Sequence, residues 1–179
     1  MSVVVGVGAL APEDVVRVAR EAALVELSPG AREAVVASRV VVDELAASDT
    51  PVYGVSTGFG ALATRHIEPA LRSQLQKSLI RSHAAGAGPR VENEVVRALM
   101  LLRLSTLATG HTGIRLETAE AYASMLNTGL TPVVREYGSL GCSGDLAPLA
   151  HCALAVMGEG EVDDHGVLLC ALPFAGTPM

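Results

Sequence analysis

One stretch decides how the rest of the chain is read: Gly138-Ser139-Leu140-Gly141-Cys142-Ser143-Gly144-Asp145-Leu146-Ala147-Pro148-Leu149. Its first half is made of small residues, and glycine permits backbone conformations and close approaches that a Cβ atom would prevent. Its second half predicts the start of a helix, with Asp145 as N-cap and Pro148 in the first turn, where a missing N–H costs little. The stretch therefore predicts an unusual backbone segment at the positive end of a helix.

Two kinds of chemistry would use Ser143. A serine hydrolase needs Gly-x-Ser-x-Gly after a strand, but the residue two positions beyond Ser143 is Asp145, so that motif is not satisfied. In the second chemistry the amide nitrogen of Gly144 attacks the carbonyl carbon of Cys142. Loss of two waters, one of them from the Ser143 side chain, then leaves a ring with an exocyclic methylidene. Such a ring is a carbon electrophile, and Cys142 contributes only its carbonyl to it.

The stretch resembles the motif Gly-Ser-x-Gly-Ala-Ser-Gly-Asp-Leu-Ala-Pro-Leu of the histidine ammonia-lyases, within the wider aromatic amino acid lyase family. The resemblance implies that Cys142, Ser143 and Gly144 are catalytic and form 4-methylideneimidazol-5-one (MIO), with no external cofactor. Cys142 stands where the family has Ala, and we expect it to be tolerated because its side chain stays outside the ring. The implied fold is mainly α: the N-terminal helical domain of the aromatic amino acid lyase fold, with a long Gly-rich active-site loop and a small β-hairpin near the end.

A second glycine-rich segment, residues 51–60, interrupts the helical periodicity between residues 47 and 69. A long loop inside a compact domain is usually functional or disordered, and composition alone leaves a flexible linker with two anchoring aromatic residues as an equal alternative. The family's inner active-site loop, Tyr-Gly-Val-Asn-Thr-Gly-Phe-Gly, is similar to residues 53–60, with Ser56 in place of Asn. By this resemblance Tyr53 is the catalytic base, a role that needs positive charge or hydrogen-bond donors near its phenolate.

Ser82 and His83 follow a run in which Leu71, Leu75 and Leu79 recur every four residues, as on one face of a helix. A single histidine near a helix end is more often a surface or capping residue than a ligand. The histidine-specific members of the family have Ser-His at this point, and the resemblance implies that His83 binds the imidazole of the substrate. Relatives that act on tyrosine or phenylalanine differ here, so His83 predicts L-histidine as substrate.

Composition restricts the partners and the compartment. The chain of 179 residues is half apolar, has 3% aromatic residues and carries a formal net charge of −6. This composition favours closely packed helices, and the acidic balance disfavours nucleic acid and anionic membranes, so a small molecule is the expected partner. The longest uncharged run is too short for a membrane span, no secretion signal is recognisable, and the three cysteines indicate neither a disulfide framework nor a metal site. We therefore expect a cytoplasmic protein.

Apolar periodicity predicts a mainly helical chain. The predicted helices lie at residues 12–27, 29–46, 71–85, 92–108, 116–127 and 145–157. Residues 1–10 are β-prone, and residues 158–169 predict a β-hairpin. The acidic turn of that hairpin lacks the later Glu of an EF-hand, so we interpret it as a solvated turn and not as a calcium site.

The same periodicity predicts which side chains are buried. In the helix over residues 92–108 the expected core face carries Val95, Leu99 and Leu102, with Arg97 off that face. The expected buried stripe of the helix over residues 29–46 consists of Ala34, Ala37, Val41 and Leu45. His151, in the last predicted helix, is interpreted as a hydrogen-bonded core histidine.

Family chains continue beyond this length into a helical bundle that supplies further active-site residues. The resemblance therefore implies that residues 1–179 are the N-terminal, MIO-bearing domain of an enzyme that converts L-histidine to trans-urocanate and ammonia, the first step of histidine degradation, as a homotetramer. One alternative is a related tyrosine or phenylalanine ammonia-lyase or aminomutase. Another is an inactive fragment or assembly partner, because an isolated piece would expose helix faces meant for burial. We expect residues 1–179 alone to be inactive.

Overall fold

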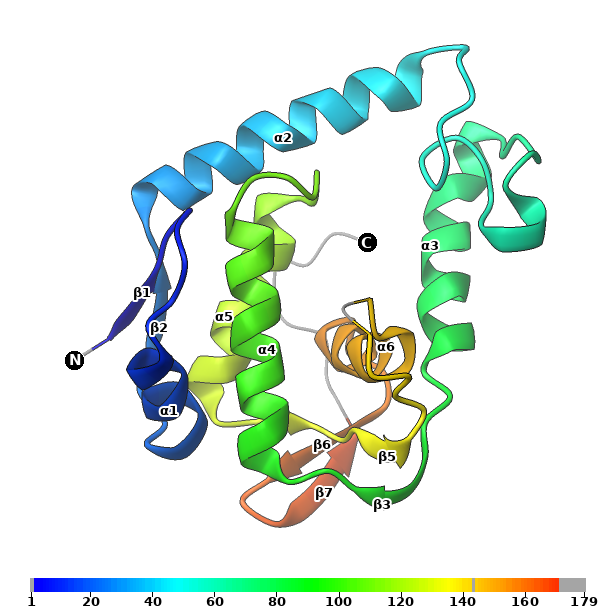
Figure 1. The fold of residues 1–179 in the computed structure, drawn as a ribbon. Helices are drawn as coiled ribbons and strands as arrows, with labels where there is room; N and C mark the ends of the chain where they lie inside the picture. The colour runs from blue at the N-terminus through cyan, green and yellow to red at the C-terminus, as the bar shows by residue number, and fades with distance from the viewer. Residues whose placement is uncertain (1, 143, 171–179) are drawn as a thin grey trace.

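The computed structural model describes residues 2–142 and 144–170, and within them it is mainly helical, as predicted (Figure 1). The helices are α1 (Pro12–Arg20), α2 (Pro29–Ala47), α3 (Pro69–His83), α4 (Asn93–Ala108), α5 (Leu116–Thr128) and α6 (Leu146–Val156), with a short 3-10 helix η1 (Gly60–Leu62). Most begin at the predicted place, and three of them have a proline as their first residue, where it is pre-organised for a helix.

The strands of this part of the chain form three small sheets. They are β1 (Val3–Val5), β2 (Val25–Leu27), β3 (Ala87–Arg90), β4 (Thr131–Pro132), β5 (Arg135–Tyr137), β6 (Glu161–Asp164) and β7 (Val167–Cys170). β1 pairs with β2 in parallel, β3 pairs with β5 antiparallel, and β4, β6 and β7 form an antiparallel sheet in that order. The predicted hairpin is confirmed as β6–β7. His165 and Gly166 form its two-residue turn, both with positive φ (49° and 93°).

The prediction for the first helix was wrong at its C-terminal end. α1 ends at Arg20, and Ala22 has a left-handed φ of 51°. Beyond it, β2 pairs with β1 and buries Val25 and Leu27 while Glu26 points outward. This alternation has the period of a strand, and in a three-residue segment it is too short to be distinguished from helical spacing.

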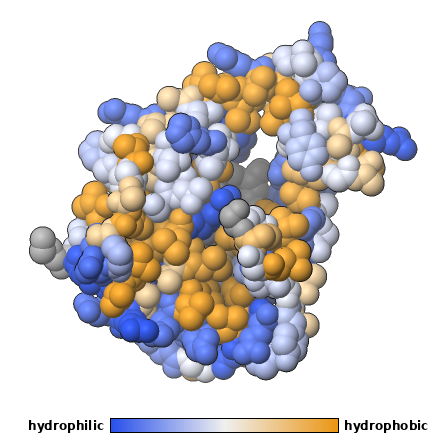
Figure 2. Space-filling view, viewed as in Figure 1, coloured by the Kyte–Doolittle hydropathy of each residue, from blue (hydrophilic) through white to orange (hydrophobic). Residues whose placement is uncertain are grey.

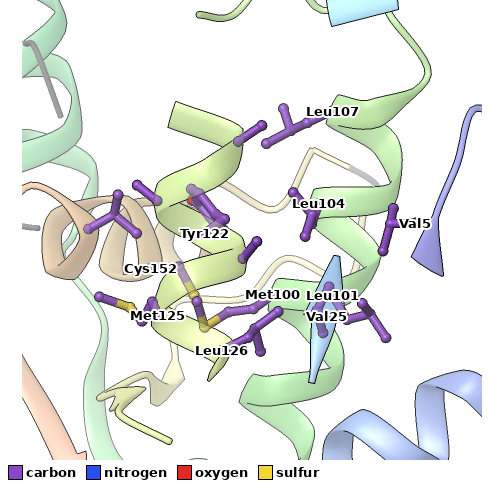
Figure 3. Packing of buried hydrophobic residues seen from close by; sticks show 14 of the residues in the cluster. Val5, Val25, Met100, Leu101, Leu104, Leu107, Tyr122, Met125, Leu126 and Cys152 are labelled. Atoms are coloured by element: carbon purple, nitrogen blue, oxygen red, sulfur yellow. The ribbon is translucent and has the colours of Figure 1, made fainter. Parts of the chain in front are cut away.

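The core lies where α4 packs against α1, α2 and α5, with β1 and β2 alongside (Figure 3). Its largest fully buried side chains include Met100, Leu101, Leu104, Met125 and Leu126. In α5, Ala119, Ala123 and Leu126 share one face and are all buried. These buried side chains hold α4 against α5. The two helices thereby support the chain segments that follow them.

The predicted core face of α4 was wrong, because Val95 and Leu102 are each 50% exposed and Arg97 is only 7% exposed. Apolar residues surround this helix on nearly every side, so the apolar pattern did not distinguish its faces. The stripe predicted for α2 was also wrong. Only Ala31 and Val35 of α2 are buried, near its N-terminus, and the helix then extends past the end of α4 (Figure 1).

Arg97 joins the C-terminal turns of two helices. Its Nε donates to the carbonyl oxygen of Val18 in α1 at 3.1 Å, and its Nη1 donates to that of Leu126 in α5 at 3.2 Å. Burial lowers the pKa of Arg97. It forms no ion pair with a carboxylate among the described residues. The partial negative charge at the C-terminal ends of α1 and α5 stabilises its positive charge instead.

We expect the substitution Arg97→Met to lower the free energy of unfolding by about 3 kcal/mol, because two buried carbonyl oxygens lose a charged donor. Urea unfolding of both proteins measures the difference. Arg103→Met on the same helix is the control, and its change should be about 0.5 kcal/mol or less. Equal effects of the two substitutions would contradict the bridging role of Arg97.

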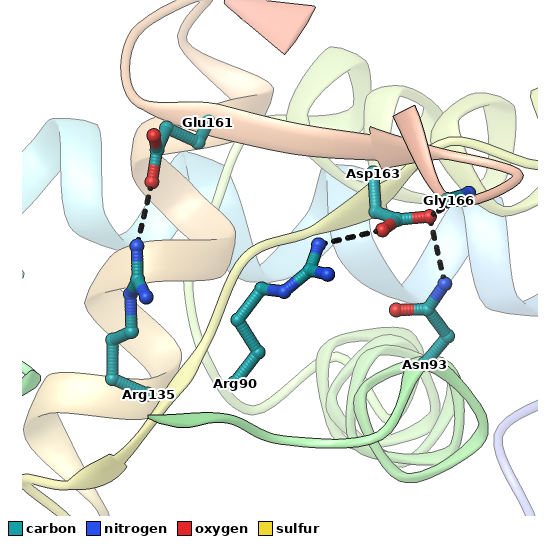
Figure 4. Close-up of polar contacts among 6 residues, drawn as sticks. All are labelled: Arg90, Asn93, Arg135, Glu161, Asp163 and Gly166. Atoms are coloured by element: carbon teal, nitrogen blue, oxygen red, sulfur yellow. Dashed lines mark hydrogen bonds and ion pairs between the residues drawn. The ribbon is translucent and has the colours of Figure 1, made fainter. Parts of the chain in front are cut away.

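Asp163 ties the β6–β7 hairpin to the start of α4 (Figure 4). Its carboxylate accepts hydrogen bonds from the Gly166 amide at 2.8 Å, from Asn93 Nδ2 at 2.9 Å and from Arg90 Nη1 at 2.9 Å. These donors, the Gly166 amide first, hold the pKa of Asp163 below its ordinary value. The interpretation of this acidic segment as a solvated turn was therefore wrong for Asp163, which is buried and structural.

We expect Asp163→Asn to lower the free energy of unfolding by about 2 kcal/mol at neutral pH, because an amide cannot accept from all three donors. A carboxyl group whose pKa is lowered by folding stabilises the protein above its unfolded-state pKa of about 4, and this stabilisation is lost as pH falls through the folded-state pKa. The gap between the two proteins should therefore close in acid. Urea unfolding at several pH values tests this, with Asp164→Asn as the neighbouring control, and a gap independent of pH would disprove it.

Candidate active site

The predicted cofactor stretch forms a loop that leads from β5 into α6. Asp145 occupies the N-cap position, as predicted, but its carboxylate makes no capping bond to the helix. It accepts instead from the Leu140 amide at 2.8 Å and from the Ser139 hydroxyl, and the Gly141 amide donates to Ser139 Oγ at 3.2 Å. The Asp145 carboxylate therefore holds the loop against the start of α6. The loop thus stays beside the positive end of α6.

Cys142 and Gly144 flank Ser143, which lies outside the described residues. Both flanking residues are exposed, and the Cys142 thiol is free. Gly141 has a left-handed φ of 65° just before them. A Cβ atom added at Gly144 would meet nothing within 4 Å. The backbone around the predicted ring-forming residues is therefore open to a small molecule.

The segment that carries Tyr53 is an ordered turn system and not a flexible linker. The Val52 carbonyl oxygen accepts from the amides of Val55, Ser56 and Thr57, and the Ser56 hydroxyl accepts from the Val52 amide at 2.9 Å. Ser56 and Thr57 are fully buried. Ser56, which stands in place of the family's asparagine, thus works inside the loop, a role that the sequence did not indicate.

Tyr53 itself lies at the surface of this loop, with 61% of its area exposed. Its hydroxyl oxygen accepts a hydrogen bond from the Gly60 amide at 3.3 Å. Its ring meets Phe59 edge to face, with centroids 5.6 Å apart and an interplanar angle of 82°. Gly54 brings Phe59 close, because an added Cβ there would lie 2.7 Å from that ring. The phenol is therefore held by its ring while its oxygen faces an N–H donor and solvent.

The Tyr53 loop is attached to the helix that ends at His83. Gln76 of α3 donates from Nε2 to the Gly54 carbonyl oxygen at 3.3 Å. Gln76 and His83 are seven residues apart, so they lie on the same face of α3, two turns or about 10 Å apart along the axis. α3 in turn packs against α6. The helix pair α3 and α6 thus carries all three segments predicted for the site.

His83 is the last residue of α3 and is half-buried. Its Nδ1 lies 2.8 Å from the carbonyl oxygen of Leu79 and 3.0 Å from Ser82 Oγ. A carbonyl oxygen only accepts, so in the neutral ring Nδ1 carries the proton and Nε2 keeps its lone pair. Nε2 makes no hydrogen bond to the described residues. Nε2 is therefore left as a hydrogen-bond acceptor.

No hydrogen bond links Tyr53, His83 and the loop of residues 138–145 within the described chain. Figure 2 shows the molecule hollowed between α3 on one side and α2 with α4 on the other, with apolar side chains along the α2 border.

The described residues contain no group of three His, Cys, Asp or Glu side chains that would hold a metal ion, and none of their helices is long and apolar enough to cross a membrane.

His151 is hydrogen-bonded, as predicted, but it is only half-buried and its partner was not foreseen. The Gly86 amide donates to His151 Nε2 at 3.0 Å, across 65 positions of sequence. Burial lowers the pKa of His151, and the charge of Arg135 lowers it further. Nothing in the local sequence around either residue signals this contact, because it forms only when α3 packs on α6.

The glycine-rich loop is bound at the start of α6, the tyrosine loop is bonded to α3 beside it, and the histidine is the last residue of α3. Residues 10–173 match the model of the aromatic amino acid lyase family. This chain belongs to the aromatic amino acid lyase family.

Known proteins show how broad this similarity is. The chain is 67% identical to the histidine ammonia-lyase of Streptomyces griseus over 162 residues, which are 90% of this chain and 32% of that one. Among solved structures it is similar to tyrosine aminomutase from Streptomyces globisporus (TM-score 0.89, 37% identity, 96% of this chain and 32% of that chain). It is also similar to histidine ammonia-lyase from Trypanosoma cruzi (TM-score 0.86, 34% identity, 96% and 33%). The chain thus spans about a third of the length of these relatives.

Proposed function

We propose that the protein carrying this chain is a histidine ammonia-lyase, which converts L-histidine to trans-urocanate and ammonia without oxidation or hydrolysis. The 67% identity to the Streptomyces griseus enzyme carries this proposal. In the reaction a C–H bond at the β-carbon and the C–N bond of the amino group break, and a carbon–carbon double bond forms. The β-proton is only weakly acidic, so the reaction needs both a base and a means of making the amino group a leaving group.

The geometry of His83 supports histidine as the substrate. Its Nδ1–H is held by the Leu79 carbonyl oxygen, so its Nε2 remains available as an acceptor for a ligand. An imidazole N–H is a matching donor, whereas the phenyl ring of phenylalanine has none, and an unpaired acceptor beside it would cost binding free energy. A substrate whose ring donates a hydrogen bond is therefore preferred at this position.

Tyr53 is proposed as the base that takes the β-proton. The Gly60 amide donates to its oxygen, which is the kind of contact that stabilises a phenolate. Its position on an exposed loop, held by the contact with Phe59, lets it meet a substrate that enters from solvent. General bases placed in this way contribute roughly 10²- to 10⁴-fold to a rate.

The residues at 142–144 fit the MIO group that family membership implies. Gly144 has open space around it, Gly141 supplies a left-handed turn before the tripeptide, and the positive end of α6 lies next to it. Cys142, Ser143 and Gly144 would form the group, which when present supplies an electrophile. The amides of Leu146 and Ala147, which bond to none of the described residues, would stabilise negative charge beside it.

We further infer that residues 1–179 are the N-terminal domain of a cytoplasmic homotetramer and that they are inactive alone. Exposed apolar side chains along α2 support this inference, since they suit burial against another helix. They are Val36, Val40, Val41 and Leu45. The three free cysteines are in keeping with a reducing compartment.

The test is to express the complete gene and to follow the ultraviolet absorbance of urocanate with L-histidine, in parallel with assays using L-tyrosine and L-phenylalanine. Urocanate from histidine and no product from the others is the expected result. Turnover of tyrosine or phenylalanine instead would show that the protein is a related tyrosine or phenylalanine ammonia-lyase or aminomutase. No product from any of the three, with folded protein, would refute the proposal, and turnover by residues 1–179 alone would refute the inference about the fragment.

A further inference from the structure

His151 lies in the second turn of α6 and reaches the connection between α3 and β3. This connection, residues 84–86, begins directly after His83. The only polar contact of its Gly86 amide within the described residues is the hydrogen bond to His151 Nε2 at 3.0 Å. The ring of His151 is therefore the anchor of the backbone that follows His83.

Gly86 is closely packed against its neighbours. A Cβ atom added at Gly86 would lie 2.9 Å from His151 Nε2 and 3.2 Å from Arg135 Cβ. On the other side, a Cβ added at Gly138, the first residue of the cofactor stretch, would lie 3.1 Å from the Gly86 Cα and 3.0 Å from Ala147 Cβ. The connection after α3, the start of the cofactor stretch and α6 thus meet at Gly86.

The contact requires a neutral ring. Nε2 accepts from the Gly86 amide only while it keeps its lone pair, so a protonated His151 would present an N–H to another N–H. Burial and the charge of Arg135 lower the pKa of His151, and Glu161 opposes them. Arg135 is itself bound to Glu161 at 3.0 Å (Figure 4). It also donates to the Gly88 carbonyl oxygen at 3.4 Å. On α3, Arg81 is paired with Glu159 at 2.6 Å.

We propose that His151 is a positioning residue of the proposed lyase reaction, because its ring fixes the backbone at Gly86 and so sets the place of His83 relative to the cofactor stretch. The proposal rests on the proposed function. His151 acts through His83 and touches neither the substrate nor residues 142–144. It therefore governs how well the imidazole of the substrate is held and has little part in the chemical step.

Two variants of the complete enzyme separate this role from a merely structural one. His151→Leu removes the acceptor and should raise KM for histidine about 10-fold with kcat changed less than about 3-fold, because one hydrogen bond is lost. His151→Gln keeps an acceptor that does not titrate, and it should restore KM to within about 3-fold of the wild type. As pH falls, KM of the wild type should rise more steeply than KM of His151→Gln. His111→Gln, at an exposed turn, is the control and should behave as the wild type.

Hydrogen exchange at residues 84–88, followed by mass spectrometry without substrate, gives a readout independent of activity. The Gly86 amide should exchange faster in His151→Leu than in the wild type and His151→Gln at the same pH. If the protein shows this exchange pattern but makes no urocanate, the role of His151 in holding Gly86 is supported and the proposed function is refuted. Urocanate formation with unchanged exchange and KM in His151→Leu would overturn the positioning role. If His151→Leu fails to fold, a wild-type pH profile identical to that of His151→Gln overturns it.

Discussion

Replacement of Ser143 by alanine in the complete enzyme is expected to lower kcat by roughly 10³-fold or more, because the proposed electrophile forms only when the Ser143 side chain loses its hydroxyl as water. Cyclisation joins the Gly144 nitrogen to the carbonyl carbon of Cys142, and one of the two waters lost takes the oxygen of Ser143. Alanine has no hydroxyl to lose, so no methylidene forms. Cys142→Ala is the matched control, since it restores the tripeptide usual in the family and should keep the activity.

Activity alone does not separate this mechanism from hydrolysis by a serine nucleophile, which also fails without Ser143. The intact mass does separate them. An enzyme with a closed ring is lighter than its encoded chain by two water molecules, and we expect this deficit in the wild type and in Cys142→Ala. An active wild type with its full encoded mass would exclude the ring and the mechanism built on it.

The substitution Tyr53→Phe is expected to reduce kcat by about 10²- to 10⁴-fold with little change in KM, because it removes the proposed base and leaves the substrate contacts in place. The fold should persist, since phenylalanine keeps the edge-to-face contact with Phe59 and loses only the bond from the Gly60 amide. Steady-state kinetics with histidine measure both parameters.

Tyr137→Phe is the control for removal of a phenol oxygen near the site. Tyr137 is 65% exposed on β5, and its hydroxyl makes no hydrogen bond to the described residues. We expect its kcat to stay within about 2-fold of the wild type. If Tyr53→Phe kept wild-type kcat as well, another group would have to take the β-proton.

Much of the fold was predictable where a pattern is long and local. Residues 116–127 were expected as a helix, and α5 spans Leu116–Thr128. Predictions failed where the pattern did not distinguish one face from another. Val95 and Leu102 of α4 were predicted to face the core, with Arg97 off that face, but Arg97 is the buried one of the three. It is buried because it donates to the carbonyl oxygens of Val18 and Leu126, which belong to helices far away in sequence.

The candidate site was likewise predictable only in part. Residues 53–60, His83 and residues 142–144 were recognisable one by one from their types and order, because each depends on a short run of sequence. Their attachment to one helix pair was not recognisable. It depends on Gln76 bound to Gly54 and on the packing of α3 against α6, which no local spacing encodes.

The sequence by itself indicated the family, the tripeptide proposed to form the ring and the helical character of the chain, since backbone propensity and reactive groups are properties of neighbouring residues. Only the tertiary structure decided that Asp145 folds the cofactor loop instead of capping α6, that Asp163 is buried among three donors, and that His151 anchors Gly86. Each of these side chains has several possible partners of similar hydrogen-bond strength. Which partner it takes is set by where packing of the apolar core places distant backbone groups, and that depends on the whole chain.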